Sequence, residues 1–226
     1  MGEVPRGWRI GSLVDIAKIT MGQSPPGESY NEAGSGLPFY QGTRDFGWRF
    51  PKRRVYCTQP TRYAEPGDVL LSVRAPVGHL NIANERCAIG RGLAALRHLI
   101  LPNGFLYYLL RATQLGWAKF EAEGTVFGSA SKNDVTGFPI IIPDERLVAA
   151  FGRLVEPIDA LIEVNEREMS GLASIRDTLL PKLMSGELRL KNAQLEITEA
   201  PRSPGEEARA QAYRRHLRPN DRYRRR

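Results

Sequence analysis

The sequence has few cysteines and histidines and no long apolar run. Its two cysteines, Cys57 and Cys87, stand thirty residues apart without a histidine pair nearby, so neither a zinc site nor a disulfide framework is indicated. No apolar run reaches the roughly eighteen residues that cross a membrane, and the segment MGEVPRGWRIGSL lacks the apolar core of a signal peptide. We therefore expect a cytoplasmic protein with no metal site and no membrane contact.

Motifs of several enzyme classes are also absent. The sequence contains no GxxxxGKS/T phosphate-binding loop, no GxGxxG after a strand, no HExxH and no GxSxG. The three histidines, His79, His98 and His216, stand alone, so a histidine general base has no evident orienting partner. The Asn-Pro-Pro-aromatic and Asp-Pro-Pro-aromatic motifs, with which adenine methyltransferases hold a flipped base, do not occur. These absences predict a non-catalytic protein.

Charge separates the chain into three segments. Residues 1–143 carry 16 Lys and Arg against 11 Asp and Glu, residues 144–190 carry 6 against 9, and residues 191–226 carry 10 against 5. A basic first segment suits a protein that binds a polyanion. The last segment has few aliphatic residues after Ile197, so we expect a disordered tail, which either adds nonspecific attraction to nucleic acid or is a solvated extension.

The first segment is expected to form a mixed, strand-rich domain. Short β-like runs alternate with turn signals such as EPGD at 65–68. The expected strands lie at 37–42, 55–57, 69–73, 79–83, 92–96 and 139–142. A helix is expected over 103–120 with Asn103 as its cap, and a short helix is expected after Ser131 with Asp134 in its first turn.

The stretch from Asp144 to Leu190 has apolar residues in steps of three and four, which is typical of a heptad seam. The seam places are Val148, Phe151, Val155, Ile158, Ile162, Asn165, Met169, Leu172, Arg176, Leu179 and Leu183. The favoured interpretation is a spacer helix that pairs with a second, similar helix; the alternative is a long helix packed lengthwise on its own domain. Pro157 should kink or break this helix, and Ser185-Gly186 should end it.

A basic segment from Gln41 to Arg54 is the strongest candidate binding site. Five basic residues are interleaved there with Phe46, Trp48 and Phe50. A glutamine amide can face adenine and an arginine fork can face guanine, whereas other basic side chains neutralise phosphates. On this basis Gln41, Arg44 and Arg49 are candidate base contacts, Lys52, Arg53 and Arg54 are candidate phosphate contacts, and Trp48 and Phe50 would hold the loop rigid or touch a thymine methyl.

Weaker candidates for DNA contact lie elsewhere in the domain. Arg74 and Arg91 are single arginines beside a strand end or a glycine, and Ser131 and Lys132 lie at the start of the expected short helix. The alternative for the whole basic segment is a solvated loop whose aromatic residues enter the core.

Four further stretches carry a family resemblance. They are VLLSVRAPVGHLNIA at 69–83, AIGRGLAAL at 88–96, GTVFGSASKNDV at 124–135 and LLPKLMSGEL at 179–188, behind an opening with Trp8, Leu13 and Gly22-Gln-Ser-Pro. In this order they resemble the specificity subunit of Type I restriction-modification enzymes. The resemblance covers residues 8 to 190.

The resemblance implies an α+β fold, with a target recognition domain at 1–143, a long spacer helix at 144–190 and a tail at 191–226. Such a domain recognises one half of a bipartite site on double-stranded DNA. The subunit docks methyltransferase (modification) subunits, which hold S-adenosylmethionine, and through them motor-nuclease (restriction) subunits. This chain itself is expected to bind no cofactor.

The family pattern has two recognition domains and two antiparallel helices, whereas this sequence has one of each and resembles a half-subunit. We therefore expect an antiparallel homodimer that recognises an interrupted palindrome, with Asn165 fixing the register of the two helices. The alternatives are a detached recognition domain of a fused restriction-methyltransferase, a coiled-coil adaptor without a DNA role, and a silent cassette that exchanges specificities by recombination.

Overall fold

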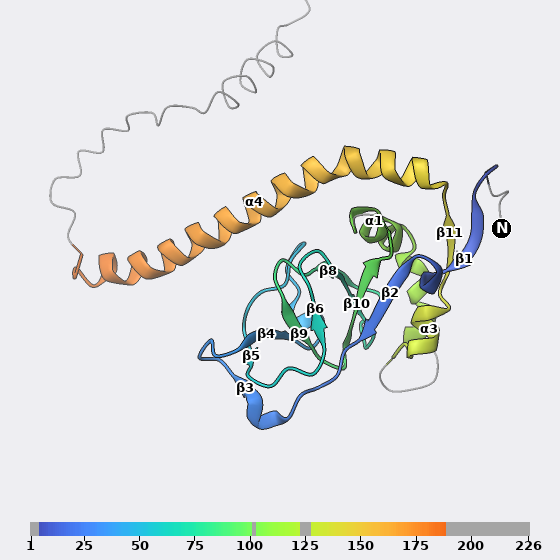
Figure 1. Ribbon diagram of the computed structural model, residues 1–226. Helices are drawn as coiled ribbons and strands as arrows, with labels where there is room; N and C mark the ends of the chain where they lie inside the picture. The colour runs from blue at the N-terminus through green and yellow to red at the C-terminus, as the bar shows by residue number, and fades with distance from the viewer. Residues whose placement is uncertain (1–4, 101–102, 123–127, 189–226) are drawn as a thin grey trace, which may run out of the picture. The chain divides into compact units, whose positions relative to one another are not determined.

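The computed structural model describes residues 5–100, 103–122 and 128–188 (Figure 1). The chain forms two compact units, Met1–Glu166 and Arg167–Arg226. The first unit holds all described strands and the first part of the long helix α4 (Glu145–Met184). The boundary between these units falls inside α4, and the end of the recognition domain at residue 143 stays a prediction. The predicted tail at 191–226 lies outside the described residues.

A two-stranded antiparallel sheet joins the start and the end of the strand-rich domain. It pairs β1 (Arg9–Ser12) with β11 (Pro139–Ile142). Ile140 and Ile142 of β11 are buried and Ile141 is exposed, which is the period of two expected for a strand with one face on a core. The strand predicted at 139–142 is confirmed.

A four-stranded antiparallel sheet carries the larger core. Its order is β2 (Ala17–Met21), β10 (Leu93–His98), β7 (Val69–Ser72) and β8 (Leu80–Ile82). Every residue of β7 is buried, and its first three residues are all apolar instead of alternating with polar ones. The strands expected at 69–73, 79–83 and 92–96 are confirmed, each within two residues at its ends.

A five-stranded sheet of very short strands completes the domain. Its order is β3 (Tyr30–Asn31), β5 (Tyr56–Cys57), β4 (Leu37–Tyr40), β9 (Cys87–Ile89) and β6 (Tyr63–Ala64). The pair β4 and β9 is parallel, and the other three pairs are antiparallel. Both cysteines are free and buried in this sheet.

The single helix expected over 103–120 is wrong. The chain forms α1 (Gly104–Ala112), the 3-10 helix η4 (Gln114–Trp117) and α2 (Lys119–Ala122). Helix α1 ends at Ala112, and the hydroxyl of the next residue, Thr113, donates to the carbonyls of Leu109 and Leu110 at 3.1 and 3.2 Å. The next turn then places Trp117 in a stack on Phe138, with ring centroids 3.9 Å apart.

Asn103 occupies the N-cap position of α1 as expected, but it does not cap the helix through its side chain. Its side chain makes no capping bond; its oxygen accepts from the backbone N–H of His98 at 2.6 Å and its amide donates to the carbonyl of Gly67 at 2.8 Å. Asn103 therefore ties the end of β10 to the turn before β7. By contrast, the short helix α3 (Lys132–Thr136) is confirmed, with Ser131 as its cap.

Three further 3-10 turns connect the strands: η1 (Leu13–Asp15), η2 (Gly27–Ser29) and η3 (Thr43–Asp45). Helix α4 continues without interruption through Pro157, so the expected break is wrong there, and the alternative, a kink, stays a prediction. The predicted stop is confirmed, because α4 ends at Met184 and Gly186 has a left-handed φ of 73°. No described helix is long and apolar enough to span a membrane. The predicted α+β class, a strand-rich domain followed by a long helix, is confirmed.

Candidate nucleic-acid interface

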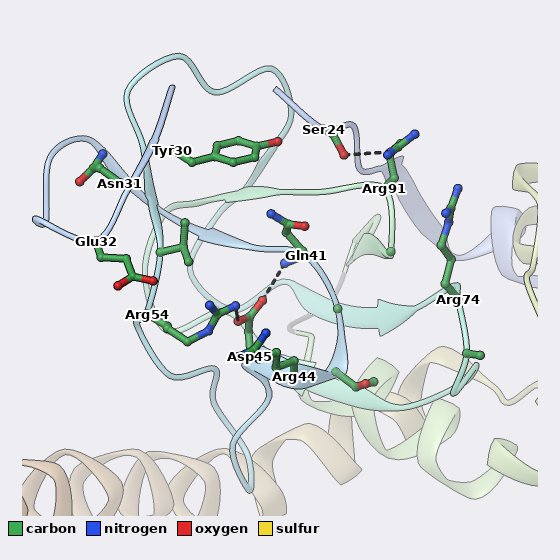
Figure 2. Close-up of a pocket in the computed structure, with 15 residues that line it drawn as sticks. Ser24, Tyr30, Asn31, Glu32, Gln41, Arg44, Asp45, Arg54, Arg74 and Arg91 are labelled. Atoms are coloured by element: carbon green, nitrogen blue, oxygen red, sulfur yellow. Dashed lines mark hydrogen bonds and ion pairs between the residues drawn. The ribbon is translucent and has the colours of Figure 1, made fainter. Parts of the chain in front are cut away.

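A hollow lined by four arginines lies on the five-stranded-sheet side of the domain (Figure 2). Its volume is about 740 Å³. Four stretches far apart in the sequence supply its lining: the loop and strand at 24–32, the segment 41–55, the turn after β7 and the turn between β9 and β10. The lining residues are Ser24, Tyr30, Asn31, Glu32, Gln41, Gly42, Thr43, Arg44, Asp45, Arg54, Val55, Arg74, Ala75, Arg91 and Gly92. The fold thus brings five of the predicted DNA contacts, Gln41, Arg44, Arg54, Arg74 and Arg91, to one surface.

Asp45 organises the floor of this hollow. It is only 2% exposed. One carboxylate oxygen accepts from the backbone N–H of Gln41 at 2.8 Å and the other from Nη2 of Arg54 at 3.0 Å. Figure 2 shows the Asp45 carboxylate between these two residues. Its own carbonyl accepts from the backbone N–H of Lys52 at 2.8 Å, so Asp45 holds both ends of the basic segment.

Two of the arginines are available for an external ligand. Arg44 and Arg74 are exposed and have no hydrogen bond or ion pair from their side chains to any residue that the structure describes. Arg91 is exposed as well and donates from Nε to the hydroxyl of Ser24 at 3.0 Å. With Glu32 and Asp45 as the acids of the lining, the hollow has an excess of positive charge that attracts phosphates.

Lys52 and Arg53 lie outside the hollow. Both are exposed, but Arg53 makes a two-pronged bond to Glu85 with distances of 2.6 and 2.7 Å. Hydrogen bonding to Glu85 raises the pKa of the Arg53 guanidinium. Lys52 is the freer of the two for a phosphate contact.

The DNA contact predicted for Arg49 is wrong, because this side chain is buried. Arg49 is 3% exposed, and its Nη2 donates to the hydroxyl of Tyr108 and to the carboxylate of Asp159, both at 2.7 Å. Burial alone would lower the pKa of this guanidinium, but the bond to Tyr108 and the nearby Asp159 charge outweigh it and the pKa is raised. Its neighbour Trp48 is 67% exposed and stays a candidate contact.

Ser131 and Lys132 are exposed at the start of α3 and do not line the hollow. The Ser131 hydroxyl caps the helix, accepting from the backbone N–H of Asp134 at 3.3 Å. Hydrogen bonds from Ser131 lower the pKa of the Asp134 carboxyl. A structural role therefore accounts for Ser131, and a DNA contact by either residue stays a prediction.

The sequence reasoning missed Ser24, Tyr30, Asn31 and Thr43, which also line the hollow. Tyr30 donates to the carbonyl of Pro25 at 2.8 Å, which fixes the loop that carries these polar groups. The Gly, Ser and Pro density of residues 21–36 indicated a loop, but no residue pattern placed it next to the basic segment. Among the described residues, no group of His, Cys, Asp and Glu side chains is arranged to hold a metal ion.

The predicted helix seam divides into two sets in the structure. Phe151 packs edge-on against Phe105 and Tyr108, with centroids 6.1 and 5.6 Å apart, and Val155 is half-buried. These two contact their own domain and are not free for a second helix. Val148 is buried and Ile162 is half-buried, whereas the remaining predicted places are exposed: Ile158, Asn165, Met169, Leu172, Arg176, Leu179 and Leu183.

The prediction also missed apolar residues that the structure leaves exposed on α4. Leu154 is 71%, Leu161 47% and Ile175 56% exposed. Leu154, Ile158 and Leu161 follow one another in steps of four and three, so they share one face of the helix. In the first part of α4, Leu154, Ile158 and Leu161 therefore form an exposed apolar row.

Comparisons with known proteins agree with this fold. The family model described as Type I restriction modification DNA specificity domain matches residues 5–167. A protein assigned as the type I restriction enzyme MjaX specificity subunit of Methanocaldococcus jannaschii is 34% identical over an alignment of 195 residues, and the match covers 84% of this chain and 46% of that protein. The chain thus spans about half the length of the curated relatives it matches.

Two solved structures are similar to the chain. The HsdS subunit from Thermoanaerobacter tengcongensis is 36% identical with a TM-score of 0.59, covering 83% of this chain and 47% of that one. A chain from a structure concerned with complex assembly and conformational transition of the type I R-M system is 39% identical with a TM-score of 0.58, covering 80% of this chain and 46% of that one. The resemblance found in the sequence is confirmed.

Proposed function

The chain belongs to the Type I restriction modification DNA specificity domain family, and from this premise we propose that it recognises one half of a bipartite site on double-stranded DNA. One observation supports this most strongly. Within the residues that match the family, four arginines from separate segments line one hollow of about 740 Å³. A concave, positively charged surface with polar side chains suits a DNA groove, whose edges carry hydrogen-bond donors and acceptors and whose walls carry phosphates.

The lining residues divide by chemistry into two roles. Gln41 can pair its side-chain amide with adenine, and Arg44 can present two donors to guanine. Both side chains are exposed, and Asp45 holds the Gln41 backbone in place. Arg74 and Arg91, on the turns after β7 and β9, are suited to phosphates, as is Lys52 outside the hollow. Phosphate contacts set affinity, and base contacts set the sequence preference.

We infer that the chain is non-catalytic and acts with partners. In this proposal it docks methyltransferase subunits in the cytoplasm, where S-adenosylmethionine is bound by those subunits and not by this chain. The methyltransferase subunits would in turn connect it to motor-nuclease subunits. The chain's own contribution is to place the methyltransferase on a chosen sequence.

We also infer that two copies associate through α4. The exposed apolar residues of this helix need a partner to leave water, and a second α4 running antiparallel offers the same residues in reverse order. Asn165, exposed among them, is of the residue type that can fix register between paired helices. Two identical domains related by a two-fold axis then require an inverted repeat with a gap.

Selection of bound duplexes from a random pool tests the DNA proposal. The chain would be used with and without its methyltransferase subunits, because one small domain makes few phosphate contacts and binds weakly alone. Gln41→Ala and Arg44→Ala should make the preference for particular bases weaker. Lys52→Ala should instead weaken binding to all sequences and lower the number of counterions released on binding by about one. Failure of both preparations to enrich any sequence would refute sequence recognition.

A further inference from the structure

A buried ion-pair cluster joins the basic segment to helix α4. The guanidinium of Arg49 lies 4.2 Å from the ring centroid of Tyr107 and 5.2 Å from that of Tyr108. Its Nη2 donates to the Tyr108 hydroxyl and to Asp159, each at 2.7 Å. The Tyr108 hydroxyl donates to the same Asp159 oxygen at 2.8 Å. Three elements, the loop, α1 and α4, therefore meet at one charged group.

The aromatic residues of α1 extend this contact along α4. Phe151, two turns before Asp159, packs edge-on against Tyr108 and Phe105. A Cβ built on Gly104 would lie 3.5 Å from the Asp159 carboxylate and 3.6 Å from Val155, so α1 starts directly against α4. These contacts decide which side of α4 faces the domain and, with it, which side faces outward.

The loop side of the cluster is tied to the hollow by the backbone. The carbonyl of Arg49 accepts from the N–H of Ile82 at 2.9 Å, which fixes the loop to β8. The backbone carbonyl of Asp45 accepts from the backbone N–H of Lys52 at 2.8 Å. The loop from Asp45 to Lys52, which includes Arg49, is thus closed by a bond between its two ends. The carboxylate of the same Asp45 accepts from Gln41 and Arg54.

Stability alone does not explain the choice of an ion pair here. A buried pair often contributes no more to stability than well-packed apolar residues of the same volume, while it fixes geometry through directional bonds. The Arg49 side chain is 4% exposed and that of Asp159 23%. Directional bonds between a DNA-recognising loop and a spacer helix are useful where the orientation of the loop relative to the helix matters.

We propose that Arg49 is a positioning residue which fixes α4 to the DNA-recognising loop through Tyr108 and Asp159, so that sequence recognition and the length of the target gap are coupled. The inference rests on the proposed function. Arg49 itself touches no DNA in this scheme. It holds the first part of α4 against the loop, and loosening this contact should let the protein bind two half-sites at more than one separation.

The test compares gap selectivity in three variants and one matched control. Arg49→Met keeps a long apolar stem and loses the charge, Asp159→Asn keeps an oxygen acceptor, and Tyr108→Phe removes only the hydroxyl. Arg86→Met is the control, because Arg86 also pairs with an aromatic ring, that of Tyr63 at 4.8 Å, and with an acid, but at an exposed site away from α4.

Each full-length chain, assembled with its methyltransferase subunits, would be assayed for transfer of tritiated methyl groups to duplexes. These carry the selected half-sites at the preferred gap and at gaps one and two base pairs longer and shorter. We expect Arg49→Met to reduce the preference for the natural gap by about tenfold, with smaller reductions in the other two variants. The Arg86→Met control should keep the wild-type gap profile, and all variants should keep the same half-site sequence.

A second measurement does not depend on DNA. Hydrogen exchange of the free chain should become faster over the first part of α4 in Arg49→Met and not in Arg86→Met. An unchanged gap profile in all three variants, an equal loss of rate at every gap, or unchanged exchange would overturn the inference. Absence of any sequence-selective methylation by the wild type would instead refute the proposed function, while the exchange result would still decide whether Arg49 holds α4.

Discussion

Replacing Asp45 by alanine separates the positioning of the hollow from the general stability of the domain. The substitution leaves the backbone N–H of Gln41 without its acceptor at 2.8 Å and frees Arg54, whose bond is 3.0 Å long. An orphaned N–H costs about 1 to 3 kcal/mol, with the lower end fitting an exposed residue such as Gln41. The ion pair adds at most about 1 kcal/mol, because the Arg54 side chain is 40% exposed and screened by water.

The expected loss of unfolding free energy is therefore about 2 kcal/mol, equivalent to a fall of about 4 to 8 °C in Tm for a chain of this size. Urea denaturation and thermal melting measure it. Selection from random duplexes at a temperature where the variant is folded then measures its sequence preference. We expect a relaxed preference, because Gln41 and Arg54 lose their common anchor.

Asp68→Ala supplies the control for this experiment. Asp68 is also a buried carboxylate that accepts one backbone N–H, that of Glu65 at 2.9 Å, and pairs with a half-exposed arginine, Arg97, at 2.7 and 2.9 Å. It does not line the hollow. Asp68→Ala should lower the free energy of unfolding by a similar amount and leave the selected DNA sequence unchanged. Equal relaxation in both variants, or in neither, would refute a positioning role for Asp45.

Three further substitutions have defined outcomes. Trp117→Ala removes the ring stacked on Phe138 in the larger core and should lower the free energy of unfolding by about 3 to 5 kcal/mol in urea denaturation; a loss below 1 kcal/mol would contradict this packing. Ser131→Ala should raise the pKa of Asp134 in an NMR titration, because the Ser131 hydrogen bonds hold it low. Because the pKa of Asp134 is lower in the folded than in the unfolded chain, this carboxylate stabilises the fold at pH values above its unfolded pKa, and the stabilisation is lost as pH falls through the folded pKa. Ser131→Ala should therefore make the free energy of unfolding depend less on pH in the acid range. An unmoved Asp134 pKa would refute the capping bond. Cys87 should not react with a thiol reagent at pH 8 in the folded chain, because burial raises its pKa to about 12, and reaction as fast as in the unfolded chain would contradict its burial.

The strands could be predicted because their signal is local. The run VLL at 69–71 is apolar and lies between the turn EPGD at 65–68 and the turn APVG at 75–78. Pro139–Ile142 has a short β-branched run before the helix. The signal for the end of α4 is also local, because Gly186, which has a positive φ, follows the helix. Such features depend on a few neighbouring residues, and the sequence alone contains them.

The site could be predicted only in part, because burial depends on partners far along the chain. Arg44 and Arg49 have the same side chain in one basic segment, yet Arg44 is exposed and Arg49 is buried by Asp159, 110 residues away. Heptad spacing likewise could not show that Phe151 packs on α1 while Leu154 faces outward. In both cases a tertiary contact chose among residues that the local pattern leaves equivalent.

The most direct measurement is the sequencing of modified bases in the DNA of cells that carry this chain together with its methyltransferase subunits. We predict methylation of one interrupted motif whose two half-sites form an inverted repeat, and a broadened motif when Gln41→Ala replaces the wild type. An asymmetric motif would contradict the homodimer. A motif that is the same with and without this chain would contradict its role in DNA recognition.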